Sequence, residues 1–208
     1  MTEARGYTTE QERFWAGEFG DHYVRRNRDA ALVTANVALF RRILETTGPL
    51  ESILELGANI GLNLKALHEL LPEVRLAGVE INREAWSELS AMPFVEAHHA
   101  SILDFEADGR FDLVFTKGVL IHMAPERLEQ VYATMIESSR RYVCLAEYYN
   151  PTPVEVPYRG HERRLFKRDF AGEILERWPV ELVDYGFVYR RDPHHPQDDL
   201  TWFLLEKR

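Results

Sequence analysis

The sequence predicts a single α/β domain of 208 residues built on a mostly parallel sheet. Three observations lead to this fold class. A short apolar run at residues 52–56 ends at Gly57 and passes directly into a helical pattern, which predicts a strand, a turn and a helix. A second strand-like run, residues 75–80, ends in an acidic residue. Further strand-like runs then alternate with helical stripes, as in repeated βαβ units.

Two helices are expected before the first strand. A capping box at Thr9 opens the first helix, which is expected to break at Gly20. The second is expected from about residue 29 to residue 46, because apolar residues recur on one face and Gly-Pro follows. We therefore divide the chain into a helical lid, residues 1–48, and a sheet core, residues 49–208, with the lid lying across the mouth of a ligand site.

The turn after the first strand has the residues of a cofactor site. Gly57 and Gly61 are four positions apart, whereas the dinucleotide fingerprint places its first and last glycines five apart. With Glu55 ahead of them, they match the acidic-x-G-x-G-x-G pattern of class I S-adenosylmethionine-dependent methyltransferases. Asn59 replaces the middle glycine, and asparagine tolerates the left-handed conformation well. The spacing favours S-adenosylmethionine over NAD, although the glycines could also simply form a turn.

Glu80 strengthens this interpretation. It lies 23 positions beyond Gly57, close to the roughly 20-residue spacing of the carboxylate that binds ribose hydroxyls. A carboxylate accepts two hydroxyl protons at once, which suits this task, whereas an acid exposed at a strand end is the alternative. The third strand is expected at residues 93–97. The predicted cofactor-binding residues are Glu55, Gly57, Asn59, Gly61, Glu80, Ile81, Ser101, Ile102, Thr116 and Lys117.

The fourth strand, residues 110–116, is expected to end where the cofactor and the acceptor meet. It continues with Thr-Lys-Gly rather than the Asp/Asn-Pro-Pro-aromatic sequence of methyltransferases that act on base amines, which disfavours a nucleic-acid amine as acceptor. His122 is a candidate general base because its unperturbed pKa lies near neutral pH, and a structural histidine is the equal alternative. Glu147, at the end of the fifth strand, is the second candidate base.

A long segment follows the fifth strand, residues 141–147. Residues 148–164 are rich in aromatic, basic and proline residues, and loops of this length are usually functional or disordered. Aromatic residues argue against disorder, and the carboxyl edge of an open α/β sheet is where ligands bind. Arg159 could hold a phosphate or carboxylate with two hydrogen bonds. The predicted substrate-binding residues are Trp15, Tyr23, Tyr148, Tyr149, Asn150, Tyr158, Arg159, His161 and Asp198.

A helix at residues 166–178 and two strands, residues 180–190 and 200–206, are expected to complete the chain. The connection between these strands contains two histidines and two aspartates, so a metal site has to be weighed there, as it does at the His-His pair of residues 98–99. Adjacent residues of an extended chain point to opposite faces, so residues 98 and 99 are poorly placed to share an ion. For the histidines and aspartates between the last two strands, an ordinary solvated turn is the alternative to a metal site. We expect no metal.

Composition excludes several classes of protein. A net charge of −9 disfavours non-specific nucleic-acid binding, which depends on cationic surface. No apolar run has membrane-spanning length, and residues 1–12 lack the apolar core of a signal peptide. Cys144 is the single cysteine, so no disulfide can form within the chain. A cytoplasmic location is therefore expected, with no membrane partner, while the oligomeric state is left open.

Several segments together resemble the methylases associated with pseudaminic acid biosynthesis. The resemblance covers nearly the whole chain, includes Asn59, and is carried by residues 9–20, 54–63, 116–122, 146–161 and 196–199. It implies a Rossmann-like class I methyltransferase fold with seven strands, the last antiparallel, and helices on both faces. It also implies methyl transfer from S-adenosylmethionine.

The expected function is methyl transfer from S-adenosylmethionine to a polar small molecule, with a sugar or sugar nucleotide as first candidate. The alternatives are another small-molecule pathway, such as a natural product, or an RNA or protein acceptor. A non-catalytic, cofactor-binding regulatory protein is the alternative from another class. A basic surface patch would favour RNA, and the polar residues of the long segment argue for catalysis.

Overall fold

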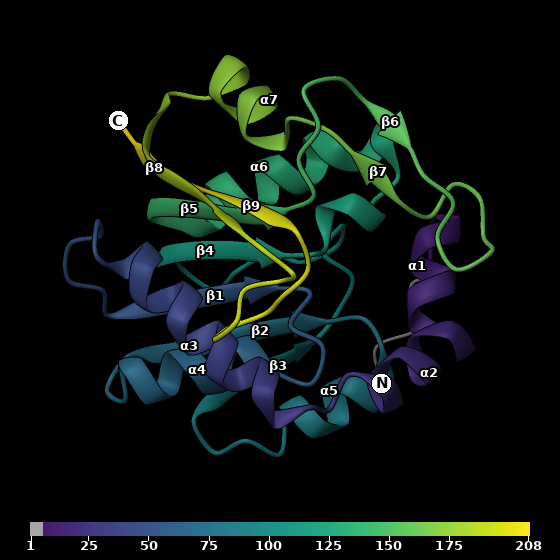
Figure 1. Ribbon diagram of the computed structural model, residues 1–208, viewed down its shortest axis with the longest axis horizontal. Coiled ribbons are helices and arrows are strands. Elements are labelled where there is room, and N and C mark those ends of the chain that lie inside the picture. Colours follow the sequence, from purple (N-terminus) through teal and green to yellow (C-terminus); the bar gives the residue numbers. More distant parts are fainter. Residues whose placement is uncertain (1–5) are drawn as a thin grey trace.

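A computed structural model describes residues 6–208, so the first five residues of the predicted lid lie outside it. Seven strands form one sheet in the order β3-β2-β1-β4-β5-β9-β8 (Figure 1). The strands are β1 (Ser52–Leu56), β2 (Arg75–Glu80), β3 (Val95–His99), β4 (Phe111–Lys117), β5 (Ser139–Glu147), β8 (Val180–Val188) and β9 (Leu200–Lys207). β1 to β5 run parallel, and β9 is antiparallel to both of its neighbours, β5 and β8. The predicted seven-stranded, mostly parallel sheet is confirmed.

Helices cover both faces of the sheet (Figure 1). The helices are α1 (Glu10–Ala16), α2 (Glu18–Arg26), α3 (Ala30–Leu44), α4 (Leu62–Leu70), α5 (Arg83–Leu89), α6 (Leu128–Ser138) and α7 (Phe170–Arg177), with 3₁₀ turns η1 (Leu120–His122) and η2 (Pro125–Arg127). One core cluster contains side chains of α3, α4 and α5, and the other contains side chains of α6 and α7. Because both faces are covered, all five residues of β1 are buried.

β9 shows how the sheet serves both cores. Trp202 and Leu204 pack in the cluster of α3 and α4, whereas Phe203 and Leu205 pack toward α6 and α7, as the two-residue period of a strand requires. Gly186 of β8 lies directly against Trp202, and a Cβ there would be 2.7 Å from the indole nitrogen. Because residue 186 is a glycine, the large buried side chain of Trp202 fits between the strand and the helices.

The N-terminal helices break at a different residue from the one predicted. Gly17 is extended and separates α1 from α2, whereas Gly20, the predicted break, lies inside α2. A Cβ at Gly20 would be 1.9 Å from the carbonyl oxygen of Trp15, so this glycine allows α2 to fold back closely on α1. The capping box is confirmed, since Thr9 and Glu12 bind each other's backbone N–H groups.

Two further expectations need correction. The helix predicted over residues 166–178 begins only at Phe170, where the Asp169 side chain accepts a hydrogen bond from the N–H of Gly172. The residues before it form β7 (Phe166–Lys167), which pairs with β6 (Val154–Glu155) in a separate two-stranded sheet. The third strand lies two residues later than predicted and includes both histidines of the His-His pair.

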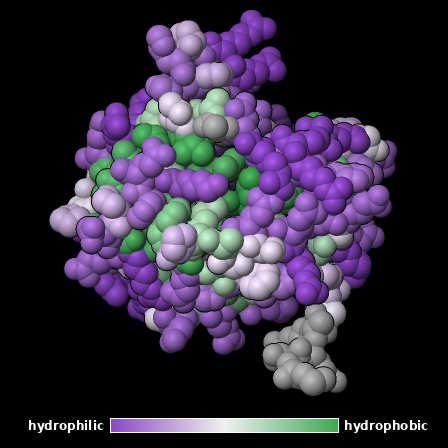
Figure 2. All heavy atoms as spheres, turned by 90° about the horizontal axis from the view of Figure 1, so that it is seen from below, coloured by the Kyte–Doolittle hydropathy of each residue, from purple (hydrophilic) through white to green (hydrophobic). Residues whose placement is uncertain are grey.

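The face of the molecule drawn in Figure 2 is mostly hydrophilic. Figure 2 shows one limited area where apolar side chains reach the surface, surrounded by polar ones. Of the helices in residues 6–208, none combines the length and the apolarity needed to cross a bilayer.

Candidate active site

A cavity of about 530 Å³ lies at the carboxyl edge of the parallel strands. Its wall includes residues from the ends of β1, β2 and β4, from the three N-terminal helices and from the hairpin between β8 and β9. Cofactor and ligand sites of proteins have volumes of roughly 300–1,000 Å³, and open α/β sheets bind ligands at this edge. This cavity is therefore the candidate active site.

The turn after β1 has the backbone that the glycine pattern predicted. Gly57, Asn59 and Gly61 all have positive φ, at 79°, 48° and 75°. Gly57 also passes close to the next loop, because a Cβ there would be 2.7 Å from Cγ2 of Val119. The N–H groups of Gly57 and Ala58 both donate to the carbonyl of Val79, each at 2.9 Å, which attaches the turn to β2. Gly61 caps α4 from just outside the cavity wall.

Glu80 lies in the cavity wall at the end of β2, held by backbone N–H groups. The N–H of Asn59 donates to its Oε2 and the N–H of Asn82 to its Oε1, both at 2.7 Å. Burial raises the pKa of Glu80, and these two bonds lower it in part. Each oxygen keeps a free lone pair for a ligand hydroxyl. Ile81, the next residue, also lines the cavity.

Glu55 lies behind the wall and reaches the cavity through Asn63. The Asn63 amide donates to Oε1 of Glu55 at 2.5 Å, while Oε2 of Glu55 and Oδ1 of Asn63 are buried without a partner among residues 6–208. Burial raises the pKa of Glu55 to about 8, although Asn63 and the charge of Lys117 lower it. Burial lowers the pKa of Lys117 in turn, and Glu55 opposes that shift. Thr116 is fully buried and lies outside the residues that line the cavity.

Ser101 and Ile102 both line the cavity, on the side of β3. The Ser101 hydroxyl accepts from the N–H of Leu103 at 3.2 Å, which fixes the loop that follows the strand. Glu12 of the lid lies in the same part of the wall, and Ser101 is among the groups that lower the pKa of its carboxyl. The lid and the loop after β3 thus meet at this end of the cavity.

His122 is a buried histidine in the cavity wall, between two aromatic rings. Its ring centroid is 4.7 Å from that of Trp15 and 4.8 Å from that of Tyr158. Its Nδ1 lies 2.6 Å from the carbonyl oxygen of Arg164. A carbonyl only accepts, so Nδ1 carries the proton and Nε2 has a lone pair. Burial lowers the pKa of His122 to about 4, partly opposed by the Arg164 bond, so the ring is neutral at pH 7.

Glu147 is placed as a helix cap rather than as a base that faces a ligand. Its Oε1 accepts from the N–H groups of Val119 and Leu120, at 3.1 and 3.2 Å, and its Oε2 accepts from that of Ile121 at 3.4 Å. The side chain is buried, and burial raises its pKa to about 7. It lies outside the residues that line the cavity. Its carboxylate positions η1 and the loop that carries His122.

Three predicted substrate residues lie close together where the hairpin between β8 and β9 borders the cavity. Tyr23 and Asp198 line the cavity, and Tyr148 adjoins Asp198. Burial raises the pKa of Tyr23 to about 12, and the nearby Tyr158 and Asp198 add to this. Burial also raises the pKa of the Tyr148 phenol, with the charge of Asp198 as the next cause. Both phenols therefore remain protonated hydrogen-bond donors.

Trp15 also lines the cavity, whereas the other predicted substrate residues lie outside its wall. Tyr158 and His161 form a tight turn, with Arg159 at its exposed tip and the Arg159 guanidinium 5.8 Å from the Tyr158 ring. His161 packs against Phe14 of α1, with ring centroids 5.1 Å apart. The structure does not bring Tyr149 and Asn150 to the cavity. Tyr149 is exposed and contacts Phe203, and the Asn150 amide binds the carbonyl of Thr152 at 2.5 Å.

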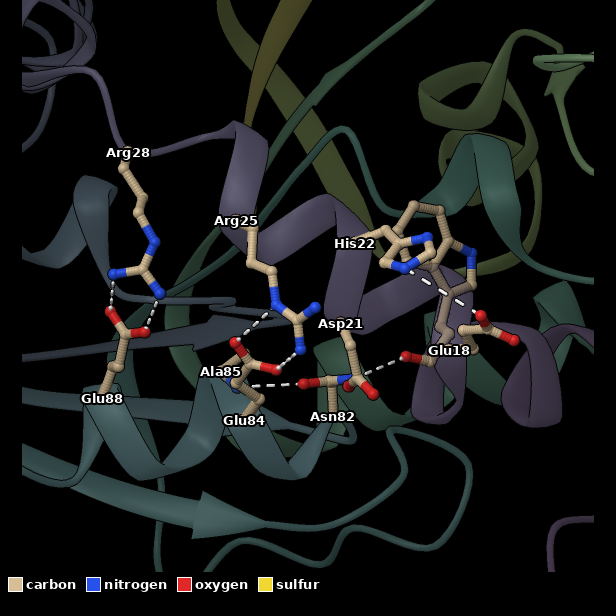
Figure 3. A network of polar contacts seen from close by, with 10 residues as sticks. Glu18, Asp21, His22, Arg25, Arg28, Asn82, Glu84, Ala85 and Glu88 are labelled. Atoms are coloured by element: carbon tan, nitrogen blue, oxygen red, sulfur yellow. Dashed lines mark hydrogen bonds and ion pairs between the residues drawn. The ribbon is translucent and has the colours of Figure 1, made fainter.

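The N-terminal segment that is predicted to act as a lid is attached to α5 by one buried amide and two surface ion pairs (Figure 3). The Asn82 side chain donates to the Trp15 carbonyl at 3.2 Å and to Asp21 Oδ1 at 2.8 Å, and its own oxygen caps α5. The ion pairs are Arg25–Glu84 and Arg28–Glu88. Since the N–H of Asn82 also binds Glu80, this one residue joins the lid to the predicted ribose carboxylate.

Sequence reasoning missed several residues of the wall. They are Glu12, Asn36, Asn63, Asn82 and Gln197. Asn82 follows Glu80 by two residues and precedes a helix, a position that by itself indicates only an N-cap. Asn63 lies two residues after Gly61, in the motif itself, and was the one that the pattern could have identified. Asn36 lies on a predicted apolar helix, and nothing in its spacing distinguished it.

Metal ligands are not gathered anywhere in the described residues 6–208, where no group of three or more His, Cys, Asp or Glu side chains could hold an ion. Nε2 of His98 lies 3.2 Å from Glu96, and Nε2 of His99 lies 3.2 Å from the carbonyl of Ile81. The hairpin histidines are exposed, and their N–H groups bind Asp192.

The fold is that of the class I methyltransferases. A crystal structure of magnesium protoporphyrin IX methyltransferase from Synechocystis PCC 6803 superposes with a TM-score of 0.69 over 95% of this chain and 97% of that chain, at 13% identity. The Burkholderia thailandensis 1,6-didemethyltoxoflavin N1-methyltransferase gives 0.69 over 94% and 86%, at 16% identity. A Leishmania major S-adenosylmethionine-dependent methyltransferase gives 0.72 over 94% and 81%, at 15% identity.

Residues 53–141 match a methyltransferase domain family. No curated protein matches the chain in sequence. The matched domain and the fold agree with the enzyme class predicted from the sequence, an S-adenosylmethionine-dependent methyltransferase, and with its cofactor. The cavity suits that cofactor, since its wall offers a carboxylate with free lone pairs at Glu80 and, at Asn63, a buried amide oxygen that has no partner among residues 6–208.

Proposed function

We propose that the protein transfers a methyl group from S-adenosylmethionine to a polar small molecule bound at the Tyr23–Asp198 end of the cavity. The observation that carries the proposal is a single cavity whose wall contains both sets of residues. One end has the glycine turn and Glu80, and the other has Tyr23 and Asp198. A donor and an acceptor held in one enclosed space gain most of the rate enhancement from alignment.

The cofactor supplies a methyl group on a positively charged sulfur. Glu80 would accept the ribose hydroxyls on its free lone pairs, and Ser101 and Ile102 would contact the adenine. The positive-φ turn allows close approach of the methionine end, where Lys117 and Asn63 line the wall. Glu55 then contributes a negative charge next to the cationic end.

On the acceptor side, the phenols of Tyr23 and Tyr148 donate and Asp198 accepts, which suits an acceptor with several hydroxyl groups. His122 is the better supported base, because its neutral ring has a fixed tautomer and lines the cavity. Glu147 is less suitable, since three backbone N–H groups occupy its carboxylate. The low pKa of His122 makes it a weak base, so alignment would contribute more than proton transfer.

A sugar or sugar nucleotide remains the first acceptor to test. Its support is the resemblance to methylases associated with pseudaminic acid biosynthesis and the hydroxyl-binding character of the acceptor end. Arg159, at the tip of its exposed turn, could bind the phosphates of a nucleotide. The toxoflavin and porphyrin precursors named for the solved relatives support small molecules as a class and extend the acceptors to natural products.

Calorimetric titration of the purified protein tests the cofactor site directly. We expect micromolar binding of S-adenosylmethionine, no binding of NAD, and a loss of at least about 100-fold in Glu80→Ala, since this removes two hydrogen bonds to a charged group. Tyr149→Phe, outside the cavity, is the matched control and should bind normally. Binding of NAD, or normal binding by Glu80→Ala, would contradict the proposal.

A further inference from the structure

Within residues 6–208, the hydrogen bonds to the Glu12 carboxylate of α1 all converge on one of its two oxygens. Its Oε2 accepts from the N–H and hydroxyl of Thr8, both at 2.9 Å, and from the N–H and hydroxyl of Thr9, at 2.8 and 3.0 Å. Its Oε1 is buried and has no hydrogen-bond partner among residues 6–208. The capping box therefore fixes the orientation of the carboxylate and leaves one oxygen unused.

This oxygen belongs to a charged side chain in the wall of the cavity. Glu12 is 5% exposed and lines the cavity together with Ser101 and Ile102. Burial tends to raise the pKa of its carboxyl, but Ser101 and the threonine donors outweigh burial and lower the pKa below its usual value. The group is thus ionised at neutral pH. The Ser101 hydroxyl is close to the carboxylate, yet Oε1 has no hydrogen bond within residues 6–208 and keeps a lone pair for a ligand. An unmet acceptor on a buried carboxylate costs roughly 1–3 kcal/mol or more, so a ligand donor is expected there.

The chemistry of the cofactor identifies the donor. Ser101 and Ile102 mark the end of the cavity proposed for adenine, and the ribose hydroxyls are assigned to Glu80. At the base end, the only hydrogen-bond donor on the adenine ring is its 6-amino group. The Ser101 hydroxyl lies near Glu12, but a carboxylate oxygen has two lone pairs and can accept from both.

We propose that Glu12 accepts a hydrogen bond from the 6-amino group of the cofactor's adenine, so that helix α1 contributes to the selective recognition of adenine. The inference rests on the proposed function, because it requires S-adenosylmethionine in this cavity. It assigns to a capping-box residue a second role that the glycine motif and Glu80 do not cover. It also links cofactor binding to the order of α1, since a single carboxylate serves both.

Glu12→Gln tests the assignment because the capping box determines how the new amide is oriented. The position of Oε2 receives four donors, so the amide oxygen must occupy it and the NH₂ group must take the place of Oε1. An NH₂ group opposes the 6-amino group of adenine but complements the 6-oxo group of hypoxanthine. The variant should therefore reverse the preference between the two bases.

The probes are S-adenosylhomocysteine and its deaminated form, S-inosylhomocysteine, titrated by calorimetry. The wild type should bind the adenine compound about 10- to 100-fold more tightly, and Glu12→Gln should reduce this ratio to about 1 or invert it. Thr9→Val is the control, because it removes one donor to Oε2, weakens the helix cap and leaves Oε1 unchanged. It should retain the wild-type ratio.

A wild-type ratio that persists in Glu12→Gln would overturn the inference while leaving the proposed function intact. Failure of the wild type to bind S-adenosylhomocysteine at all would instead overturn the proposed function. Hydrogen exchange supplies a second readout that does not depend on the variant. At saturation, S-adenosylhomocysteine should protect the amides of α1 more strongly than S-inosylhomocysteine does, and equal protection would contradict the link to the lid.

Discussion

The two ends of the cavity are built in different ways. At the cofactor end, backbone groups of neighbouring strands place the key residues: the turn after β1 bonds to Val79, and Glu80 receives the N–H groups of Asn59 and Asn82. At the acceptor end, side chains come from segments far apart in the chain, such as Tyr23, Tyr148 and Asp198. The first end is determined locally by the sheet, and the second depends on tertiary packing.

Buried amides add to this difference. Gln197 of the hairpin donates to the carbonyl of Ala35 at 2.9 Å, which holds the hairpin on α3. The side-chain amide oxygens of Gln197 and of Asn36, which follows Ala35, are buried and have no partner among residues 6–208. Loops of this kind can change their ligand without disturbing the sheet, whereas the glycine turn cannot. The acceptor end is therefore where relatives with the same fold can differ in substrate.

Gly57→Ala should have the largest effect, because it strains the cofactor end in two ways. Its φ of 79° disfavours alanine, and the new Cβ would lie 2.7 Å from Val119. We expect a loss of about 2–4 kcal/mol in the free energy of unfolding and no measurable cofactor binding. Gly109→Ala has a φ of 90° with nothing within 4 Å, so denaturation should show a loss of only about 1 kcal/mol. Equal losses would show that the contact with Val119 is unimportant.

Tyr148→Phe and Asp198→Asn should impair methyl transfer without weakening cofactor binding, which would show that the two ends act independently. Each removes a polar group of the acceptor end, so methyl transfer to an acceptor that the wild type uses should fall by about 10- to 100-fold. The affinity for S-adenosylhomocysteine, measured by calorimetry, should stay within about twofold of the wild type. A tenfold loss of that affinity would mean that the two ends are not independent.

Cofactor binding should release a proton at pH 7. Burial raises the pKa of Glu55 to about 8, so its carboxyl is mostly protonated in the free protein. A positively charged ligand favours the carboxylate, so roughly one proton should leave on binding. Titrations in phosphate and in Tris measure it, because the apparent enthalpy then depends on the buffer. Glu55→Gln should abolish this dependence, and proton uptake by the wild type would contradict the assignment.

Asn82→Asp should loosen the lid with a smaller loss of affinity, about 3- to 10-fold. The carboxylate keeps the cap of α5 but loses the donors to Trp15 and Asp21 and repels the latter. Hydrogen exchange should increase in α1 and α2. Adding Asp21→Asn restores a donor to the pair and should recover part of the affinity. No recovery would mean that the Asp21 bond does not hold the lid.

Arg25→Ala should have the smallest effect. The Arg25 side chain is 60% exposed, and exposed ion pairs such as its pair with Glu84 contribute little, about 0–1 kcal/mol. The affinity for S-adenosylhomocysteine should change by less than twofold. A loss as large as that of Asn82→Asp would show that the ion pairs, rather than the buried amide, hold the lid on α5.

The same division explains what the sequence could predict. The alternation of strands and helices and the glycine turn follow from local spacing, and the structure has the predicted mostly parallel sheet and the positive φ angles of the turn. Glu80 lies at the end of β2, where the sequence placed it, and its role at the ribose stays a prediction. Gly20 was misread because a glycine that allows helices to pack closely looks, in sequence, like one that ends a helix. The hydrogen bonds from Val119, Leu120 and Ile121 to Glu147 could not be predicted, because these N–H groups lie 26 to 28 residues away in the sequence. Such contacts leave no periodic signal. The role of Glu147 as a base stays a prediction.

The position of β9 has a consequence for how the chain is made. β8 is synthesised before β9, yet β9 lies between β8 and β5 and is, in the described residues 6–208, the one strand with which β8 pairs. As it leaves the ribosome, β8 therefore carries Tyr185 and Phe187 on a strand that has no partner yet, with Tyr189 directly after it. Until residues 200–207 emerge, β5 also presents an open edge. The sheet is therefore completed only when residues 200–207 become available. A delay in translating them leaves the edges of β5 and β8 unpaired at the same time, and unpaired edges promote aggregation.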